Sequence, residues 1–283
     1  MQHEPTTGTV PVHLQIADAL RARITSGELA PGDAIPSASS LADEWGCSVG
    51  SARSAIAVLM EEGRLSGGRG KSATVRQPPV RRSLTLSSDW SQVQKDMVLR
   101  PIGERRKRGA VELIAGIPID DTDSSASYNR VLATPEIAQE FELPVGTEML
   151  QRTYEMTDKD SGARIAWSVS YIPVEYIKEN PDLLDETKEP WPGGHQHQLF
   201  TVGIEIDRFM RKVTAIQPTP GDRQKWRMEP GVPLLHVRSK SIDISEKVVE
   251  MSDATYPVDR TEIVYVEQLK RWTPQELEAA HDH

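Results

Sequence analysis

Residues 36–63 have the sequence PSASSLADEWGCSVGSARSAIAVLMEEG, and this stretch decides the fold of the N-terminal part of the chain. Ser37 and Ser48 each precede a run with apolar residues at helical spacing. A serine hydroxyl at such a position can accept a hydrogen bond from a free N–H group of the first helical turn. Because Gly46 lies between the two runs, the stretch predicts two helices joined by a tight turn, the second over residues 49–62.

The flanking residues extend this pattern in both directions. Residues 12–26 have helical apolar spacing, and Gly27 follows where a left-handed residue would end the helix. Residues 64–76 alternate weakly around a glycine-rich basic centre, which predicts a two-stranded hairpin. Three helices followed by a hairpin are the order of a winged helix-turn-helix, which we assign to residues 1–78.

A Pro-Pro pair at 78–79 marks the end of this domain. The next segment contains the basic run Arg105–Arg108 and no clear core pattern, so we expect a linker with a solvated helix over 79–108. An α+β effector domain is expected over 109–272 and a frayed tail over 273–283, which makes the chain multidomain.

The effector domain has its own pattern of alternating and helical segments. The expected strands are 147–156, 164–172, 233–243, 247–256 and 262–268. The expected helices are 135–142, 174–179, 196–201 and 207–215. The expected loops are 121–127 and 189–194.

The charges divide along the chain. The net charge of the 283 residues is −9, but residues 1–110 hold 15 Lys and Arg against 11 Asp and Glu, and the remainder holds 18 against 31. A basic front and an acidic back suit a DNA-facing domain carried by an acidic body. Cys47 is the single cysteine, which excludes an internal disulfide and favours a role as packing filler in the turn over a redox switch.

The sequence lacks the signatures of several other protein classes. The first thirty residues lack a basic start followed by an apolar core, and the sequence has no apolar run of roughly 18 residues, so we expect no secretion, no membrane association and a cytoplasmic location. Metal-type spacings of Cys and His, nucleophile motifs and phosphate-cradling glycine loops are also missing, so we expect no cofactor and no enzyme.

Six motifs, in order over about 65 residues, resemble the GntR family of bacterial regulators. They are QIADALR (15–21), GELAPGD (27–33), IPS (35–37), LA (41–42), ARSA (52–55) and LMEEG (59–63). The rest of the chain resembles the UTRA effector domain of the HutC branch, which is similar in fold to chorismate lyase. The segments that carry this second likeness are 138–143, 146–147, 152–154, 170–173 and 259–260. The resemblance implies a homodimer that binds a palindromic operator in double-stranded DNA and releases it when a small metabolite occupies the effector domain.

The resemblance also implies that helix 49–62 lies in the major groove with its first turn at the base edges. The predicted DNA-binding residues are Ser37, Ser39, Ser48, Val49, Gly50, Ser51 and Arg53, with Arg69, Gly70 and Lys71 in the wing. The family carries arginine where Ser39 and Val49 stand here. The alternatives are an ion pair of Arg53 with a C-terminal glutamate of the helix, a solvated wing turn, and a solvated face rather than DNA contact for 105–108.

The alternation of the strands predicts an effector pocket. Arg152 shares a face with apolar neighbours, and a buried charge needs an anionic partner in the protein or in a ligand. Small hydroxylated residues share a face on the next strand, where they leave room for a ligand. The predicted effector-binding residues are Arg152, Tyr154, Ser168, Ser170, Glu250 and Tyr256. The alternative is an internal pair of Arg152 and Glu250 without a ligand.

The family likeness bears on the same positions. Sugar-phosphate sensors of the HutC branch hold their ligand at positions that match Arg152, Ser168, Glu250 and Tyr256. Ser168 stands here in place of a carboxylate, and Tyr154 in place of a second arginine.

The loop 189–197 combines Trp191 with two histidines and several turn formers. It is either a long connection anchored by Trp191 or a lid that closes over the pocket and brings His195 or His197 to the ligand. Because the two histidines alternate rather than share a helical face, a metal pair is disfavoured.

The sequence therefore predicts a DNA-binding transcription regulator, a repressor released or modulated by a small anionic metabolite. Two other functions remain as alternatives. The residues at 39 and 49 suggest a regulator-derived dimeric module with weakened DNA reading. Arg152 and Glu250 would suit a chorismate-lyase-like enzyme, which the helix-turn-helix makes the weaker hypothesis.

Overall fold

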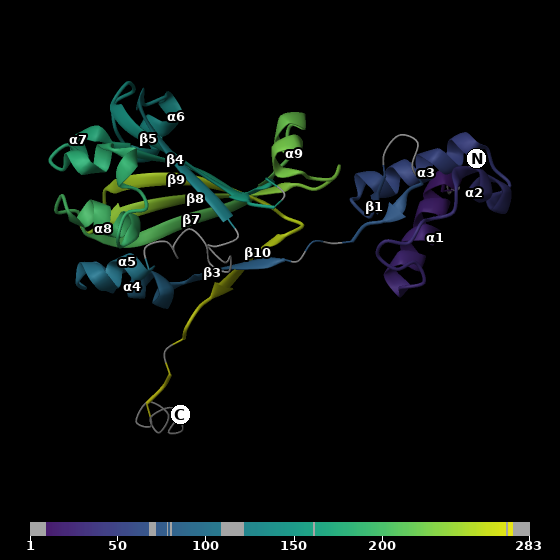
Figure 1. Ribbon diagram of the computed structural model, residues 1–283, viewed down its shortest axis with the longest axis horizontal. Helices are drawn as coiled ribbons and strands as arrows, with labels where there is room; N and C mark the ends of the chain where they lie inside the picture. The colour runs from purple at the N-terminus through teal and green to yellow at the C-terminus, as the bar shows by residue number, and fades with distance from the viewer. Residues whose placement is uncertain are drawn as a thin grey trace, which may run out of the picture.

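The computed structural model describes residues 10–67, 72–77, 79, 81–108, 122–160, 162–269 and 271–273. They form two domains, an N-terminal helical domain and a larger domain built on a sheet, which lie at opposite ends of the long axis in Figure 1. The predicted multidomain fold class is confirmed. The wing tip 68–71, which includes Arg69, Gly70 and Lys71, lies outside the described residues.

The N-terminal domain has the predicted winged helix-turn-helix. Its elements are α1 (Val12–Ser26), α2 (Ala38–Trp45), α3 (Val49–Glu61), β1 (Leu65–Ser66) and β2 (Thr74–Val75). Ser37 Oγ accepts from the amide of Ser40 at 3.0 Å, and Ser48 Oγ accepts from that of Ser51 at 3.0 Å. The two serines therefore begin α2 and α3 as expected, and the strands pair antiparallel.

Apolar side chains from all three helices and the hairpin form one core in this domain. Among its most buried members are Ile16, Leu20, Leu41, Ala52, Ala55, Leu59 and Leu65. The stripe of small residues on α3 lets this helix pack closely against α1 and α2, which leaves its other face exposed.

A six-stranded antiparallel sheet in the order β4-β5-β6-β9-β8-β7 forms the second domain. Its strands are β4 (Thr122–Leu132), β5 (Glu148–Asp158), β6 (Arg164–Pro173), β7 (Ile206–Ile216), β8 (Leu234–Asp243) and β9 (Val248–Pro257). Its helices are α6 (Pro135–Phe141), α7 (Val174–Ile177), the 3-10 helices η2 (Pro181–Leu184) and η3 (Glu186–Lys188), α8 (Gly194–Phe200) and α9 (Pro220–Trp226).

Both edge strands differ from the sequence-based expectation. Residues 207–215, expected as a helix, belong to β7, and residues 121–127, expected as a loop, largely belong to β4. Each strand is held by one neighbour and is largely exposed, so pairing rather than burial determines its conformation.

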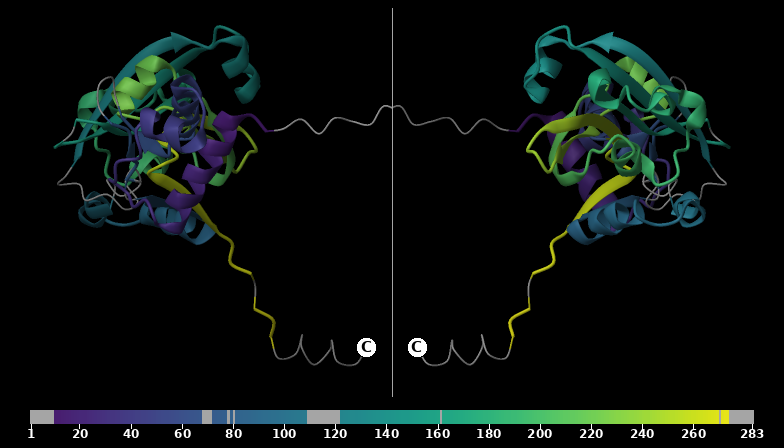
Figure 2. Two further views of the ribbon diagram at one scale, coloured as in Figure 1. Left: turned by 90° about the vertical axis from the view of Figure 1, so that its right-hand side faces the viewer. Right: turned by 90° about the vertical axis from the view of Figure 1, so that its left-hand side faces the viewer.

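Residues 79–108, expected as a linker with a solvated helix, contain the strand β3 (Arg82–Ser87) and the helices α4 (Ser88–Met97) and α5 (Ile102–Arg108). β3 pairs in parallel with β10 (Thr261–Val266), the last strand of the described chain. Beyond β10 the chain continues as an extended segment that leads away from both domains (Figure 2).

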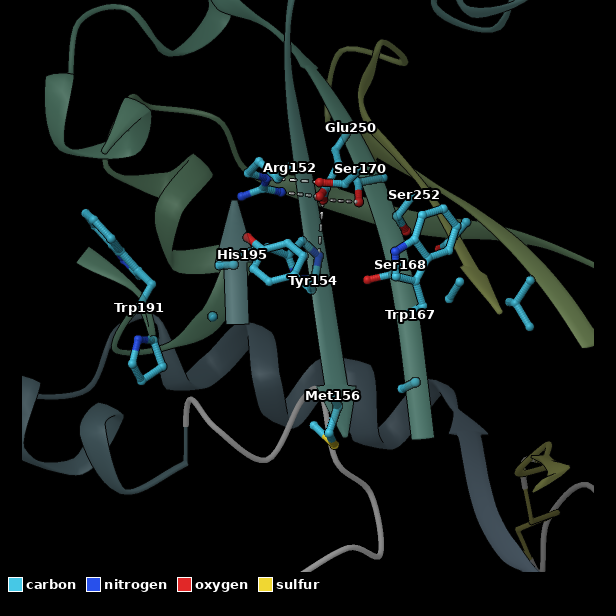
Figure 3. Close-up of a pocket in the computed structure, with 18 of the residues that line it drawn as sticks. Arg152, Tyr154, Met156, Trp167, Ser168, Ser170, Trp191, His195, Glu250 and Ser252 are labelled. Atoms are coloured by element: carbon cyan, nitrogen blue, oxygen red, sulfur yellow. Dashed lines mark hydrogen bonds and ion pairs between the residues drawn. The ribbon is translucent and has the colours of Figure 1, made fainter. Parts of the chain in front are cut away.

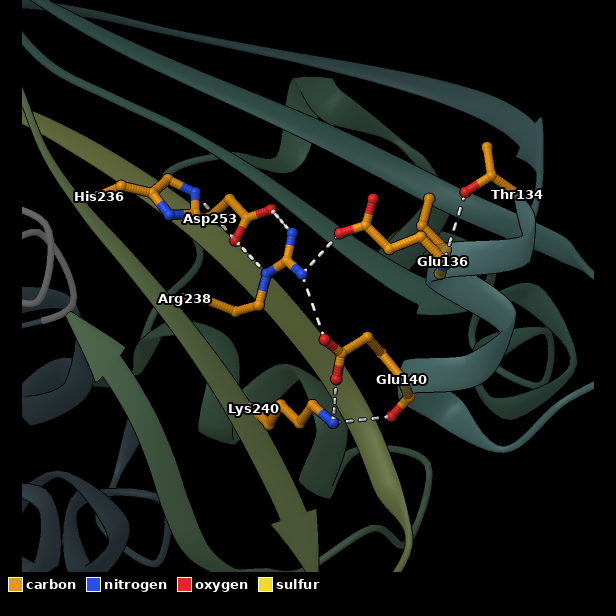
Figure 4. Close-up of polar contacts among 8 residues, drawn as sticks. Thr134, Glu136, Glu140, His236, Arg238, Lys240 and Asp253 are labelled. Carbon is orange, nitrogen blue, oxygen red and sulfur yellow. Dashed lines mark hydrogen bonds and ion pairs between the residues drawn. The ribbon is translucent and has the colours of Figure 1, made fainter. Parts of the chain in front are cut away.

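The two faces of the sheet have different covers. On one face α6 packs over Met149 and Met251, and Arg238 of β8 binds Asp253 of β9 as well as Glu136 and Glu140 of α6 (Figure 4). On the other face α7 and α8 cover only one end, where Leu199 packs among apolar residues of β5 and β6. The rest of that second face is left for a cavity.

The two domains meet where the end of α3 reaches the loop before β8. Arg76, just after the wing, forms an ion pair with Asp259 in the turn between β9 and β10. Gly231 has a φ of +79°, and a Cβ there would lie 1.5 Å from the carbonyl oxygen of Glu61. The close approach therefore requires glycine at this position.

Candidate functional site

A cavity of about 440 Å³ lies against the second face of the sheet (Figure 3). Strands β5, β6, β8 and β9 form its floor, and residues of the edge strands β4 and β7, of β3 and α4 and of the loop 189–197 complete its lining. All six predicted effector-binding residues line it: Arg152, Tyr154, Ser168, Ser170, Glu250 and Tyr256. The size and the mixture of aromatic and polar groups are those of a small-molecule site.

Arg152 lies at the polar centre of this cavity and is 2% exposed. Its Nε donates to Ser170 Oγ at 2.9 Å, one terminal nitrogen donates to Gln198 Oε1 at 2.6 Å, and the other forms an ion pair with Glu250. The internal pair that the sequence left open as an alternative is therefore present. Because both partners also line the cavity, the pair belongs to its polar surface.

Glu250 is surrounded by donors. Ser241 donates to its Oε2 at 3.3 Å, and His195 Nε2 lies 3.7 Å from the same oxygen. Burial raises the pKa of Glu250, but His195 and Arg152 lower it more, so its pKa lies below the usual value. The carboxylate is therefore charged at neutral pH.

The loop 189–197 is attached to the cavity wall through Glu189. This carboxylate accepts from the hydroxyls of Tyr128 and Tyr154, from Gln198 Nε2 and from the backbone amide of Trp191. Trp191 and His195 line the cavity. The loop is thus anchored through Glu189, and its Trp191 and His195 form part of one wall of the cavity; its closure as a lid stays a prediction.

His197 faces into the loop instead. Its Nδ1 accepts from Trp191 Nε1 at 2.8 Å. Burial, with a smaller effect from Arg105, lowers the pKa of His197 to about 4. The Cδ of Arg105 lies 3.4 Å from where a Cβ of Gly193 would be, so the first residue of the 105–108 run packs on this loop rather than on solvent alone.

Several other residues that line the cavity carry no signal in the sequence pattern. They include Gln94 on α4, Phe209 and Arg211 on β7, Ser239 and Ser241 on β8, Ser252 on β9 and Gln198 on α8. Gln94 is 3% exposed and its Nε2 is buried without a hydrogen-bond partner among the described residues. An unsatisfied donor of this kind costs about 1–3 kcal/mol, which a ligand acceptor would recover.

The predicted DNA-reading residues gather on the exposed side of α2 and α3. The exposed ones are Ser37, Ser39, Ser48, Val49, Gly50 and Arg53, whereas Ser51 is partly covered. Ser37 and Ser48 also cap their helices. Glu62 is bound to Arg21 and Arg64, and Arg53 has no ion pair among the described residues, so its guanidinium is available to a phosphate.

The described part of the chain holds no group of three or more His, Cys, Asp or Glu side chains that could bind a metal ion. It also contains no helix with the length and apolar character needed to cross a membrane.

Comparisons with known proteins agree with this architecture. Residues 13–75 match the model of bacterial regulatory proteins of the gntR family, and residues 124–262 match that of the UTRA domain. The chain is 24% identical to the mannosyl-D-glycerate transport/metabolism system repressor MngR of Escherichia coli, over 93% of this chain and 98% of MngR. It is 28% identical to the repressor NagR of Bacillus subtilis over 32% of this chain and 38% of NagR.

A solved crystal structure of a GntR-family transcriptional regulator has the same fold. It aligns with a TM-score of 0.67 and 23% identity, over 92% of this chain and 99% of that one. The likeness thus extends over both domains.

Proposed function

Because the chain belongs to the GntR family of bacterial regulators and carries a UTRA domain, we propose that it is a transcriptional repressor whose hold on DNA is controlled by a small anionic metabolite. Its relatives are named as transcriptional regulators, and this chain is likewise a DNA-binding regulator rather than an enzyme. The observation that carries the proposal is the combination, in one chain, of an exposed α3 with a separate cavity around a buried guanidinium.

On the DNA side, α3 enters the major groove. The residues that contact the duplex are those of its first turn together with Arg53, Ser37 and Ser39, and Arg69, Gly70 and Lys71 in the wing. An exposed Arg53 without an ion pair among the described residues supports this arrangement, because its charge is free to meet a phosphate. Serine and valine at 39 and 49 imply an operator different from those read by relatives that carry arginine there.

On the effector side, the ligand occupies the cavity against Arg152, Tyr154, Ser168, Ser170, Glu250 and Tyr256. Burial raises the pKa of the Tyr256 phenol to about 12, so it stays protonated and can donate to a ligand oxygen. The name of MngR connects that repressor with a mannosyl-D-glycerate system, which is in keeping with an acidic, hydroxylated effector here.

The regulator acts as a homodimer in the cytoplasm. A two-fold dimer presents two α3 helices to a palindromic operator. Support comes from large apolar side chains at and beyond β10 that are exposed in the single chain, namely Tyr265 at 69%, Leu269 at 74% and Trp272 at 74%. A second copy would cover such residues.

The test is a titration of the full-length protein against the DNA upstream of its own gene and against a scrambled duplex of the same composition. We expect the upstream DNA to bind about 10³-fold or more tightly at physiological salt. Equal affinity for both duplexes would contradict the proposal and would favour a module that has lost DNA reading. Sedimentation of the same sample gives the oligomeric state.

A further inference from the structure

One row of residues crosses the whole sheet beneath the cavity. In register from β4 to β7 the successive partners are Tyr128, Arg152, Ser170, Ser252, Ser239 and Arg211. Directly opposed residues of antiparallel strands project on the same face, so the row places three serines between two arginines. Apart from Tyr128, all members of the row line the cavity.

The two arginines differ in their partners. Arg152 is bound to Glu250, so this pair adds no net charge to the cavity. Arg211 has no ion pair within the described part of the chain; its guanidinium lies 4.8 Å from the ring centroid of Phe209. Arg211 is therefore the uncommitted positive charge among the described lining residues.

The other carboxylates of the cavity are hydrogen-bonded or ion-paired within the protein, and they lie away from Arg211. Glu186 and Glu189 accept hydrogen bonds from Tyr128 on β4, at the opposite edge of the sheet from β7. Glu155 is paired with Arg164. Four strand spacings of about 4.8 Å, or roughly 19 Å, separate the backbones of Arg152 and Arg211. The cavity thus has an acidic edge and a basic edge with hydroxyl groups between them.

Ser170 is hydrogen-bonded to Arg152, but the other polar groups between the edges have no partner within the described part of the chain. The hydroxyls of Ser239 and Ser252 make no hydrogen bond to another described residue, and the buried Nε2 of Gln94 has none either. Hydroxyls both donate and accept, so such a row is complementary to another series of hydroxyls rather than to an apolar ligand.

From this placement we propose that the serine row binds an anionic polyol, a molecule with several hydroxyl groups and one carboxylate or phosphate, and that Arg211 binds its anionic group. The hydroxyl groups of the ligand lie over Ser252 and Ser239 and reach Gln94. Arg152, fixed by Glu250, holds the inner end of the row. The proposal deepens the effector function proposed above and rests on it.

The test measures dissociation constants by calorimetry for the full-length protein with four anionic probes: D-gluconate, D-mannonate, D-glucose 6-phosphate and D-mannose 6-phosphate. D-sorbitol and D-glucosamine serve as the neutral and cationic counterparts. We expect at least one anionic probe to bind at millimolar concentration or below and both counterparts to bind about tenfold or more weakly. Whether the aldonates or the phosphates bind distinguishes a carboxylate from a phosphate.

Two variants with the same loss of charge locate the anion site. Arg211→Gln should weaken the bound anionic probe about tenfold or more, since it removes a charge-assisted contact. Lys212→Gln removes the neighbouring charge, which lies on the other face of β7 toward Glu140, and should leave the affinity unchanged. Arg211 is exposed, so its replacement does not endanger folding. Ser239→Ala should also weaken binding, by about threefold or more.

The proposal is overturned if no anionic probe binds, if D-glucosamine binds best, or if Arg211→Gln binds as tightly as the wild type. The DNA titration separates this failure from that of the proposed function. A protein that selects its upstream DNA but binds none of the probes refutes only the ligand class, whereas a protein that selects no DNA refutes the regulator function.

Discussion

Arg76 and Asp259, which are 183 positions apart, form an ion pair that joins the two domains. Their side chains are only 13% and 8% exposed. One follows the wing directly and the other lies in the turn before β10, so the pair fixes the helical domain to the sheet domain at the end of the wing.

Replacement of the acid tests the strength of this junction. Asp259→Ala leaves Arg76 shielded from water without its partner, so we expect a loss of roughly 1–3 kcal/mol in the free energy of unfolding measured with urea. Glu148→Ala, which removes the partner of Arg130 in a half-exposed pair, should cost less than about 1 kcal/mol. Equal losses would show that the junction pair does not stabilise the protein.

Gly231 tests the same junction sterically. Gly231→Ala places a methyl group against the carbonyl of Glu61, so the two domains should separate locally, and cleavage by a protease between them should become faster. Gly203→Ala is the matched control, because Gly203 has a φ of +77° and open space where a Cβ would lie. Both variants carry the same backbone strain of about 1–2 kcal/mol, and the difference between them reports the contact with α3.

The pair of Arg152 and Glu250 should matter for stability as well as for the ligand. Glu250→Gln keeps the shape but leaves a buried guanidinium without a counter-charge, and we expect unfolding to become easier by roughly 3 kcal/mol at pH 7. Glu246→Gln removes an exposed carboxylate that pairs with Arg208 on the surface, and it should lower the urea midpoint far less. If Glu250→Gln is as stable as the wild type, the charge of Arg152 is compensated by other groups.

The same carboxylate predicts a pH dependence. Because the pKa of Glu250 is lowered below its usual 4.5 in the folded protein, its contribution is fully present above pH 4.5 and is lost as the pH falls through the folded pKa. Urea midpoints of wild type and Glu250→Gln should therefore converge below pH 4.5. A difference that stays constant with pH would contradict this assignment.

His197 predicts a second, milder effect of acid. Its pKa is lowered to about 4 from 6.5, so the unfolded chain takes up a proton that the folded protein refuses between these values. Its contribution to stability is present above pH 6.5 and is lost as the pH falls toward 4. His197→Gln, which can still accept from Trp191, should show a smaller decrease in melting temperature over this range. The control is His13→Gln on α1.

Arg53 predicts the salt dependence of DNA binding. If its guanidinium contacts a phosphate, Arg53→Ala should weaken binding to all duplexes alike and reduce the slope of log affinity against log salt by about 1. Arg130→Ala, on the edge strand β4, should change neither quantity. A loss confined to one base pair of the operator would instead indicate that Arg53 reads a base.

The sequence predicted the helical domain almost residue by residue, because each of its boundaries is marked by a local signal. Ser37 and Ser48 cap their helices, Gly27 takes the left-handed conformation, and the apolar spacing matches the observed core. It also predicted the four central strands of the sheet. These strands are buried on at least one face, so the alternation of apolar and polar residues could be recognised in the sequence.

The edge strands lacked such a signal. In β7 the apolar residues Ile206, Phe209, Met210 and Val213 fall at helical spacing, which is why a helix was expected. Only the pairing of β7 with β8, a long-range interaction, makes this segment a strand. Because this segment was expected to be a helix, Arg211 and Phe209 were not included in the predicted site. The six predicted effector residues lie on strands that were correctly placed.

The parallel pairing of β3 with β10 has a mechanical consequence. Leu84, Thr85 and Leu86 of β3 line the cavity, and only a few residues of backbone connect them to Arg76 and the wing. A ligand in the cavity would therefore contact β3, the first strand after the DNA-binding domain. A shift of β3 along β10 would then displace the DNA-binding domain directly, without any rearrangement of the core of either domain.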